Sequence, residues 1–432
     1  MSGMDTVIIG SGIAGIAAGH ILKTACFNLK ILEKCIRSGG LSASFQVGGE
    51  WFDIAAHVLF ARDSWVRDLL DGETISREFP FVAYNYKKGK WIKNPVQNNL
   101  FQLDTEEKIR IIKGFIEREE GKEPRNYREW LRESYGEYFS VNYPEIYTRK
   151  YWTIEAQELE TKWVGHRMYR PSLEEVLRGA FSEDTEEVHY TGKVRYPVEG
   201  GFGTYFRHIS EGLDIVCNRD VVRIDTKNHR IECADGQMYT YDYLISTAPI
   251  KEAVGFLERV PDDVNRAAEG LHATGLVLVS ILVDGQLGVD YRTFYVYDEE
   301  IPAARVYSCS LLRGTETGKS SIQAEVYFSE FKPLTESMEE IRDKMVDLLA
   351  QMGCYKKKDV LETDVRLIPY ANIIFTPNIY RDRKIVRDYI EKQGILCAGR
   401  FGEWDYFWTE QAMLSGKRAA EKVIRQIQKC AS

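Results

Sequence analysis

The spacing of hydrophobic residues divides the chain into segments with different expected structures. The chain opens with a short apolar strand, "TVIIG", which leads into small residues at helical spacing. Residues 105–190 are rich in charged residues and tyrosine, and their apolar residues recur at helical spacing. From there to about residue 389, apolar and polar residues mostly alternate, as in strands that bury one face. Near the end, "GILCAGR" indicates a buried strand that opens onto a last helix.

Three glycines follow the first strand at fixed spacing, Gly10, Gly12 and Gly15, and a second strand ends at Glu33. This turn between a strand and a helix, with an acid about 20 residues on, is typical of dinucleotide binding. Gly10 allows the tight turn, Gly12 lets a pyrophosphate approach the backbone, and Gly15 lets the helix pack on the strand. The helix N-terminus offers free N–H groups, and Glu33 would accept hydrogen bonds from an adenosine ribose. The alternative is a glycine-rich turn that binds nothing.

A second glycine pair distinguishes between the dinucleotides. Gly39 and Gly40 follow the strand that ends in Glu33, and Leu41 comes next. A pair at this position resembles flavoproteins of the glutathione-reductase type, in the branch that holds amine oxidases, protoporphyrinogen oxidase and UDP-galactopyranose mutase. The resemblance implies FAD, because the pair lets the chain pass close to the pyrophosphate and the flavin. An NAD dehydrogenase has no evident use for it.

We therefore expect a composite α/β (α+β) fold built on a Rossmann-like FAD-binding domain of the glutathione-reductase type. In such flavoproteins the strand containing Val222 lies beside the adenine. The expected pieces are 1–85, 191–250 and 390–428 for the FAD-binding domain, 105–190 for a helical insert with a mobile active-site loop, and 86–104 and 251–389 for a mostly antiparallel sheet domain that contacts the substrate.

Composition narrows the class of protein. The chain has 432 residues and a formal net charge of -8, which argues against a general nucleic-acid-binding protein. Its eight cysteines are scattered without a C-x-x-C pair, so we expect reduced thiols in a cytoplasmic protein and no metal site. The apolar start lacks the basic segment of a signal peptide. With no run of about 18 to 20 apolar residues, we expect no membrane span.

Five aromatic residues crowd the segment "GRFGEWDYFWTEQ", which begins at Gly399 and Arg400. We expect Gly399 to end a strand of the FAD-binding domain and the next helix to point its N-terminus towards the isoalloxazine. Trp404 and Tyr406 are favoured for function, whereas core positions are favoured for Phe401 and Phe407. The rings expected to wall the flavin are Phe401, Trp404, Tyr406, Phe407 and Trp408.

Ordered blocks along nearly the whole chain resemble the UDP-galactopyranose mutase family, and its eukaryotic-type branch more closely. "FDIAAHVLF" resembles the family's F-D-x-G-G-H-x-x-F and places His57 beside the flavin. "NPVQNNL" resembles its Y-P-F-Q-N-N segment and supplies Gln97 and Asn98. "KWVGHRMYRP" resembles W-x-G-E-R-V-A-x-P and puts Arg167 on the mobile loop over the active site.

Later blocks extend the resemblance to the end of the chain. "AARVYS" falls where the family has a second arginine on the nucleotide-sugar diphosphate, here Arg305. "LIPYANIIF" resembles the segment that carries a tyrosine at the diphosphate, here Tyr370. The most specific block, "GRFGEWDYFWTEQ", resembles G-R-F-G-x-W-x-Y-x-x-x-N-Q and supplies Arg400, Trp404, Tyr406 and Gln411.

The resemblance implies a nucleotide-sugar mutase that interconverts pyranose and furanose forms for cell-surface polysaccharide biosynthesis. In that family N5 of reduced FAD attacks the sugar C1 as the diphosphate departs, and NAD(P)H is the expected reductant. Two arginines suit a departing diphosphate because they are planar, permanently charged and able to donate bidentate hydrogen bonds. Some relatives form homo-oligomers through the helical insert, and for this chain that assembly is an open alternative.

The implied site residues fall into three overlapping groups. The catalytic group is His57, Arg167, Arg305, Tyr370 and Tyr406. The cofactor-binding group is Gly10, Gly12, Gly15, Glu33, Gly39, Gly40, Leu41, His57, Val222, Gly399, Arg400, Tyr406 and Gln411. The substrate-binding group is Gln97, Asn98, Arg167, Arg305, Tyr370, Trp404 and Tyr406.

Three departures from the family pattern bear on this function. The family's Gly-Gly pair before the histidine is Ala55-Ala56 here, and alanine disfavours positive φ. The aromatic residues that hold uracil are Asn94 and Val96, so a nucleotide other than a uridine one is an alternative. The remaining differences are His166, where the family has glutamate, and Glu410, where it has asparagine.

Two other functions stay open. An oxidoreductase of the amine oxidase or protoporphyrinogen oxidase type would transfer a hydride to the flavin. That function predicts an apolar or amine-binding cavity without two arginines converging on the flavin. A non-catalytic FAD-binding protein would have no use for the converging set of Arg167, Arg305, Tyr370 and Tyr406.

Overall fold

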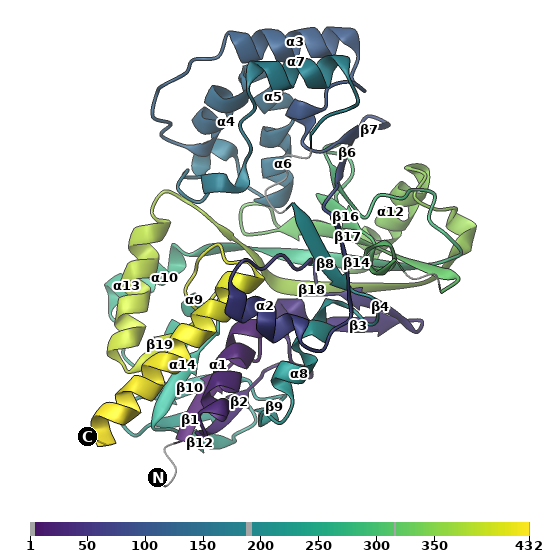
Figure 1. The fold of residues 1–432 in the computed structure, drawn as a ribbon. Helices are drawn as coiled ribbons and strands as arrows, with labels where there is room; N and C mark the ends of the chain where they lie inside the picture. The colour runs from purple at the N-terminus through teal and green to yellow at the C-terminus, as the bar shows by residue number, and fades with distance from the viewer. Residues whose placement is uncertain (1–4, 187–191, 315–316, 432) are drawn as a thin grey trace.

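Three regions stack along the long axis of the molecule (Figure 1). The computed structural model describes residues 5–186, 192–314 and 317–431. A parallel sheet with its helices forms one end, a long antiparallel sheet the middle, and a cluster of helices the other end. The predicted mixed α/β class is confirmed. The predicted boundary at residues 190 and 191 lies outside the described residues.

A five-stranded parallel sheet forms the first region, in the order β19-β13-β1-β2-β9. Its central strands are runs of Val, Ile and Leu, as expected where helices cover both faces of a parallel sheet. The strands and the two helices that pack on one another beside them are β1 (Asp5–Ile9), β2 (Asn28–Leu32), β9 (Ile215–Val216), β13 (Tyr243–Ser246), β19 (Ile395–Cys397), α1 (Ile13–Thr24) and α14 (Thr409–Ala431).

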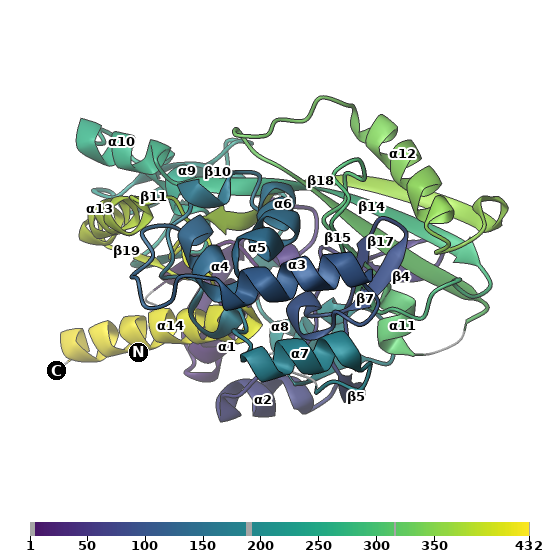
Figure 2. The same cartoon turned by 90° about the horizontal axis from the view of Figure 1, so that it is seen from above.

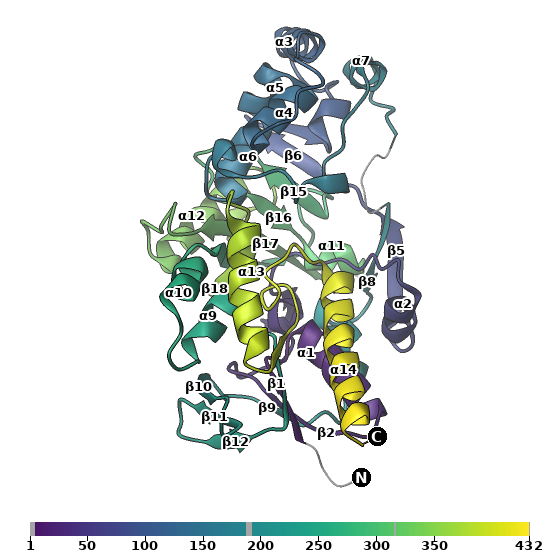
Figure 3. The same cartoon turned by 90° about the vertical axis from the view of Figure 1, so that its left-hand side faces the viewer.

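Helices α1 and α14 lie side by side although nearly the whole chain separates them (Figure 3). A Cβ on Gly416 of α14 would lie 2.1 Å from the carbonyl oxygen of Ala14 in α1. A Cβ on Gly399, after β19, would lie 2.9 Å from the Cβ of Ala14. Small residues therefore let the end of the chain close against the first strand–turn–helix.

The middle region is a seven-stranded sheet in the order β18-β14-β17-β16-β15-β6-β7. Neighbours are antiparallel except β15 and β6, and the 13-residue strand β14 is buried along almost its whole length. Helix α12 packs on one side of this sheet (Figure 1). The elements are β6 (Tyr84–Lys87), β7 (Lys90–Lys93), β14 (His272–Asp284), β15 (Thr293–Val296), β16 (Arg305–Tyr307), β17 (Lys319–Phe328), β18 (Val360–Ile374) and α12 (Met338–Gln351).

Five helices build the third region, and α3 and α7 run next to each other in the view from above (Figure 2). Aromatic side chains fill the space beneath them, including Tyr135, Phe139 and Trp163. This core explains why a segment so rich in charge still folds: most charged residues face water while the rings pack inward. The helices are α3 (Thr105–Ile116), α4 (Tyr127–Tyr135), α5 (Glu137–Asn142), α6 (Pro144–Tyr151) and α7 (Leu173–Phe181).

No helix in the described ranges is long and apolar enough to cross a membrane.

The remaining elements lie between and around these regions. The connecting strands are β3 (Ser44–Val47), β4 (Glu50–Asp53), β5 (Ser76–Pro80), β8 (Lys193–Pro197), β10 (Val221–Asp225), β11 (Arg230–Cys233) and β12 (Met238–Thr240). The α-helices are α2 (Ser64–Asp71), α8 (Arg207–Ser210), α9 (Ile250–Gly255), α10 (Asp262–Glu269), α11 (Cys309–Arg313) and α13 (Ile379–Lys392). The 3₁₀ turns are η1 (Gly40–Ser42), η2 (Val96–Asn98), η3 (Ala156–Glu158), η4 (Gly165–Arg167), η5 (Phe202–Phe206) and η6 (Lys357–Asp359).

The contact between α1 and α14 gives a first prediction. We expect Gly416→Ala to lower the free energy of unfolding by about 2 kcal/mol, because the added methyl overpacks the interface against a backbone oxygen. Urea unfolding followed by circular dichroism measures this loss. Gly255→Ala is the control, since nothing lies within 4 Å of that Cβ at the end of α9, and it should be neutral or slightly stabilising. Equal stability of the Gly416→Ala and wild-type proteins would contradict the packing.

Candidate functional site

A cavity of about 1320 Å³ lies where the three regions meet. Its wall includes the glycine turn after β1, the loops after β2 and β4, the helical region, β18 and the segment before α14. Single ligands usually occupy about 300 to 1,000 Å³, so this space can hold a dinucleotide together with a second ligand. The predicted site residues in its wall are Gly10, Gly12, Glu33, Gly39, Gly40, Leu41, His57, Gln97, Arg167, Arg305, Tyr370, Gly399, Arg400 and Tyr406.

Two glycine loops meet by backbone contact in this wall. The N–H of Gly39 donates to the carbonyl of Ser11 at 2.9 Å, and a Cβ on Gly40 would lie 3.2 Å from Cα of Gly12. No atom lies within 4 Å of a Cβ placed on Gly12, which borders the cavity at the start of α1. The free N–H groups of this helix start can therefore meet an anionic pyrophosphate.

Gly10 and Gly15 serve the turn itself. Gly10 has φ +92°, a conformation that glycine adopts readily. A Cβ on Gly15 would lie 2.0 Å from the carbonyl oxygen of Gly10, so only glycine lets the helix return this close to the turn. Gly15 lies outside the cavity wall, as its predicted packing role requires.

Glu33 is buried at the end of β2, where its carboxylate already accepts three hydrogen bonds. The donors are the N–H and hydroxyl of Ser11, at 2.8 and 2.7 Å, and the N–H of Cys35 at 2.9 Å. A carboxylate has about four acceptor sites, so one remains for a ligand hydroxyl. Glu33 therefore also fixes the glycine turn, a role that its spacing alone does not reveal.

The loop after β4 carries a strained alanine and His57. Ala55 has φ +67°, which costs about 1 kcal/mol or more for a residue with a side chain. The ring of His57 stacks on Phe202 with centroids 5.0 Å apart, and its Nδ1 lies 3.0 Å from the carbonyl of Ala55. Burial lowers the pKa of His57 to about 4, and the positive charges of Arg305 and Arg400 act in the same direction. His57 is therefore uncharged at neutral pH.

Two guanidinium groups lie close to the ring of Tyr406. Cζ of Arg167 lies 4.6 Å from the ring centroid, and Cζ of Arg400 lies 5.0 Å from it. Arg167 donates to the carbonyls of Trp163 and Tyr406 at 2.7 and 3.2 Å, while Arg400 donates to Oδ1 of Asn372 at 2.8 Å. Within the described ranges, neither arginine forms an ion pair, and Nε of each has no hydrogen-bond partner. Two uncompensated positive charges therefore border one cavity.

Arg305, by contrast, is paired with an acid. Its Nε and Nη2 donate to Oε2 and Oε1 of Glu325 at 2.6 and 2.9 Å. Glu325 is fully buried and also accepts from the hydroxyl of Tyr327 at 2.7 Å and from the N–H of Ala56 at 2.9 Å. Arg305 reaches the cavity wall as one half of a neutral pair.

Tyr370 lines the cavity close to Glu252. Burial raises the pKa of Tyr370, and the nearby carboxylate of Glu252 raises it further. Glu252 also pairs with Lys34 at 3.6 Å, next to Glu33. Glu252 thus lies between Tyr370 and Lys34, and the contact of Tyr370 with a substrate diphosphate stays a prediction.

In the aromatic segment before α14, Tyr406 lines the cavity as predicted, but three other rings are placed differently from the favoured prediction. Trp404 is fully buried outside the cavity wall, whereas Phe401 and Phe407 line the cavity. Trp404 has φ +52° within a run of turns, which directs its ring against Phe401 and Tyr370 at 5.9 and 6.2 Å. Spacing could not foresee this, because residues in an irregular turn have no fixed periodicity.

Three other predicted site residues lie outside the cavity wall. Val222 is 44% exposed, and Val221 lines the cavity in its place because neighbouring strand residues face opposite ways. Asn98 is buried beneath α7, while Gln97 borders the cavity. Oε1 of Gln411 accepts from the N–H of Trp408 at 3.0 Å, so this side chain caps the start of α14. The side chain of His166 lies outside the described part of the structure.

Among the tyrosines of the cavity wall that were not predicted are one buried ring, Tyr127, and three partly buried ones, Tyr147, Tyr295 and Tyr297. Burial raises the pKa of each, so all four hydroxyls stay protonated. No hydrogen bond of these four hydroxyls is seen within the described residues. They are uncharged donors that an oxygen-rich ligand could use. The six tyrosines within residues 127–151 are the sequence signal that could have revealed part of this set.

The pattern of this chain matches a known family over residues 13–424, described as flavin containing amine oxidoreductase. The chain belongs to this family. FAD is therefore its cofactor. A probable flavin-containing monoamine oxidase A from Dictyostelium discoideum is 31% identical over 88 residues, which are 20% of this chain and 18% of that relative's length.

Solved structures share the fold of this family member along its whole length. A crystal structure of reduced UDP-galactopyranose mutase has a TM-score of 0.91 at 21% identity and covers 98% of this chain and 96% of its own. A putative protoporphyrinogen oxidase from Exiguobacterium sp. has a TM-score of 0.75 at 19% identity, with 98% and 99% covered. Cyclohexylamine oxidase from Brevibacterium oxydans has a TM-score of 0.71 at 12% identity, with 99% and 100% covered. At these identities the likeness shows the fold.

The cavity wall fits FAD. The open Cβ position at Gly12, the paired glycine loops and the free acceptor site on Glu33 suit a pyrophosphate and a ribose. We therefore propose that the end of the cavity that contains Gly12 and Glu33 holds the adenosine diphosphate part of the cofactor.

Among the described residues, no group of three or more His, Cys, Asp or Glu side chains could hold a metal ion.

Strain at Ala55 predicts a change in stability. We expect Ala55→Gly to raise the free energy of unfolding by about 0.5 kcal/mol, because relief of a left-handed alanine slightly exceeds the added unfolded-state entropy of glycine. Ala56→Gly is the control: its φ is not positive, so the same exchange should destabilise by about 0.5–1 kcal/mol. Chemical unfolding of both variants measures the difference. Losses of equal size at both positions would show that Ala55 is not strained.

The low pKa of His57 predicts a pH dependence of stability. The unfolded state takes up a proton on this side chain near pH 6.5, whereas the folded state resists it until about pH 4. Stability should therefore fall by about 2–3 kcal/mol as the pH drops through this window, and His57→Gln should remove that part of the loss. Unfolding free energies measured between pH 7 and pH 4 test this. Parallel curves for the two proteins would contradict a buried neutral imidazole.

Proposed function

We propose that this flavoenzyme is a nucleotide-sugar mutase that interconverts pyranose and furanose forms of a sugar. The observation that carries the proposal is the pair Arg167 and Arg400 around Tyr406, without acidic partners in the described structure. These cations come from segments more than 200 residues apart and border the cavity that also suits FAD. A ligand with two adjacent negative charges would complement this pair of cations.

Repulsion between the two arginines supports an anionic ligand. Their distances to the Tyr406 centroid place the two charges at most about 10 Å apart, which costs about 1.7 kcal/mol or more at an effective dielectric constant near 20. A diphosphate between them would replace this repulsion with attraction. Arg305 adds donors to the same cavity without adding net charge, because Glu325 neutralises it.

Reduced FAD would supply the nucleophile that holds the sugar C1 while the diphosphate is detached. Arg167 would donate to the departing diphosphate and stabilise its charge, as fixed donors do in a site sheltered from water. Because His57 is uncharged at neutral pH, it would not compete with the arginines for the diphosphate. The hydroxyls of Tyr147 and Tyr295 would donate to sugar or phosphate oxygens. NAD(P)H is the proposed reductant.

Amine oxidation is the second candidate. The family description favours it, and so does the aromatic wall formed by Trp152, Trp163 and Tyr406. Against it, an ammonium substrate beside Tyr406 would meet the positive charges of Arg167 and Arg400. An oxidase would reduce oxygen to hydrogen peroxide while it oxidises primary amines in air.

Incubation of the reduced protein with nucleotide sugars separates the two functions. The flavin is reduced anaerobically with dithionite, and a panel of uridine, thymidine and guanosine diphosphate sugars is added. A product of unchanged mass but different retention supports the mutase. Peroxide formation from amines, with no isomerised sugar, would replace the mutase with an oxidase.

Arg167→Ala gives the matching binding prediction. We expect the dissociation constant of UDP for the reduced enzyme to rise about 10- to 100-fold, because a charged hydrogen bond contributes about 1.5–3 kcal/mol. Isothermal titration measures this change. Arg170→Ala is the control, since Arg170 pairs with Glu133 and stacks on Trp130 outside the cavity wall. Unchanged UDP affinity in Arg167→Ala would contradict a diphosphate site at Arg167.

A further inference from the structure

One buried carboxylate connects the two sides of the cavity. Glu325 lies on β17 with no exposed surface and accepts four hydrogen bonds, which fill its acceptor sites. Two come from Arg305, one from the hydroxyl of Tyr327 and one from the backbone N–H of Ala56. The substrate-side guanidinium and the loop that carries His57 therefore share a single anchor.

The sheet fixes this anchor in place. Arg305 and Glu325 are register partners on the neighbouring strands β16 and β17. The N–H of Ala304 also donates to the backbone carbonyl of Glu325 at 2.9 Å, beside the paired side chains. An arginine side chain loses much rotamer freedom when it is held, so two donors to one rigid carboxylate define where the guanidinium points. The orientation of Arg305 therefore depends on Glu325.

The other end of the connection is a loop under strain. Ala56 follows Ala55, whose φ is +67°, and precedes His57, which faces the cavity. The Ala56 N–H has Glu325 as its acceptor at 2.9 Å. Relaxation of Ala55 to negative φ would reorient this N–H and take away one of the four donors that hold the carboxylate. Movement of the loop would therefore reach Arg305 through their shared acceptor, Glu325.

We propose that Glu325 is a positioning residue that couples the loop 54–57 to Arg305, so that ligand bound at Arg305 and the conformation of the cofactor-side loop influence each other. The proposal rests on the proposed function in that the ligand is taken to be a diphosphate. By linkage, the effect runs equally in both directions: ligand that fixes Arg305 also fixes Ala56. The two tests below separate the loop contact from the ligand.

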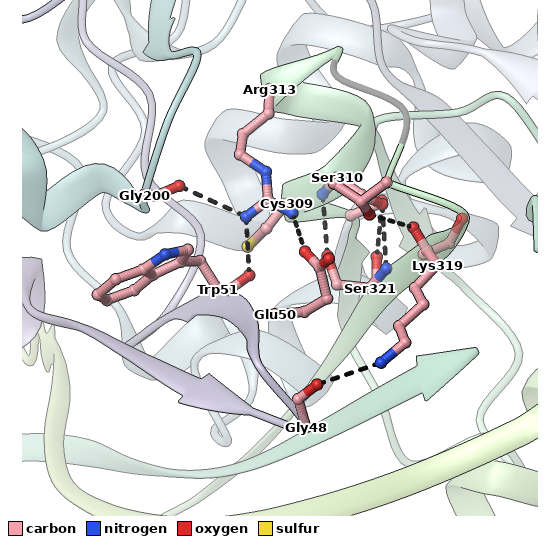
Figure 4. Close-up of polar contacts among 12 residues, drawn as sticks. Gly48, Glu50, Trp51, Gly200, Cys309, Ser310, Arg313, Lys319 and Ser321 are labelled. Carbon is pink, nitrogen blue, oxygen red and sulfur yellow. Dashed lines mark hydrogen bonds and ion pairs between the residues drawn. The ribbon is translucent and has the colours of Figure 1, made fainter. Parts of the chain in front are cut away.

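A second buried arginine–glutamate pair offers a matched control (Figure 4). Arg313 donates to Glu50 at 2.6 Å and to the carbonyls of Trp51 and Gly200, both at 3.4 Å. Arg313 and Glu50 are 3% and 13% exposed in their side chains and lie outside the cavity wall. Glu50→Gln therefore disturbs a similar ion pair in the same part of the fold without touching the loop or Arg305.

The first test needs no substrate. Amide hydrogen exchange at Ala56 is measured in the FAD-loaded wild type, Glu325→Gln and Glu50→Gln. We expect at least tenfold faster exchange in Glu325→Gln, because the amide nitrogen of glutamine cannot replace all the lost acceptors, and a change within twofold in Glu50→Gln. Arg305→Lys is the milder variant should Glu325→Gln fold poorly, and it should speed exchange about threefold. Wild-type exchange in both Glu325→Gln and Arg305→Lys would overturn the coupling.

The second test measures communication through the pair. In the wild type and in Glu50→Gln, saturating UDP should slow exchange at Ala56 at least threefold. In Glu325→Gln, UDP bound at a saturating concentration should leave that exchange unchanged. Slowing of equal size in Glu325→Gln would overturn the proposal, since a merely structural glutamate would not remove it. If UDP does not bind to the wild type, thymidine and guanosine diphosphates take its place in this test. Absence of binding of all three would refute the proposed function, while the first test would still decide on the contact between Glu325 and the loop.

Discussion

The backbone contact between two glycine loops is the constraint on which the rest of the site depends. Gly39 and Gly40 can approach Gly12 this closely because none of the three carries a side chain. The contact holds the loop after β2 against the start of α1 and leaves the helix N–H groups open to the cavity. Glu33 holds the same turn by accepting hydrogen bonds from Ser11. The same carboxylate therefore shapes the cofactor site and still has one acceptor position for the cofactor.

Charge organises the remainder of the cavity. Three guanidinium groups border the cavity, and their partners differ. Glu325 neutralises Arg305. Within the described ranges, Arg167 and Arg400 donate only to uncharged groups. Burial of uncompensated like charges is unfavourable unless a ligand of opposite charge arrives. Burial, together with the positive charges of Arg305 and Arg400, lowers the pKa of His57, so its imidazole stays neutral. The cavity is thus prepared for an anion at one place and for uncharged contacts elsewhere.

The sequence predicts most where backbone geometry dictates residue type. The glycine spacing, the acid after the second strand and the mixed α/β class follow from rules of close approach and hydrophobic period, and the structure has them. It predicts least where turns decide direction. Trp404 turns into the core through a positive φ, and Val222 faces away while Val221 faces the cavity. Glu325 carried no local signal at all, because its partners come from strands and loops distant in the chain.

Alanine at position 55 gains meaning from that distant carboxylate. A left-handed alanine costs about 1–2 kcal/mol, and a hydrogen bond to a buried charged acceptor returns about 1.5–3 kcal/mol. The two effects nearly balance, so the bond from Ala56 to Glu325 decides whether the loop keeps this conformation. A glycine at position 55 would keep the same backbone without that support. Alanine therefore makes the position of His57 conditional on Glu325, and Glu325 is in turn held by Arg305.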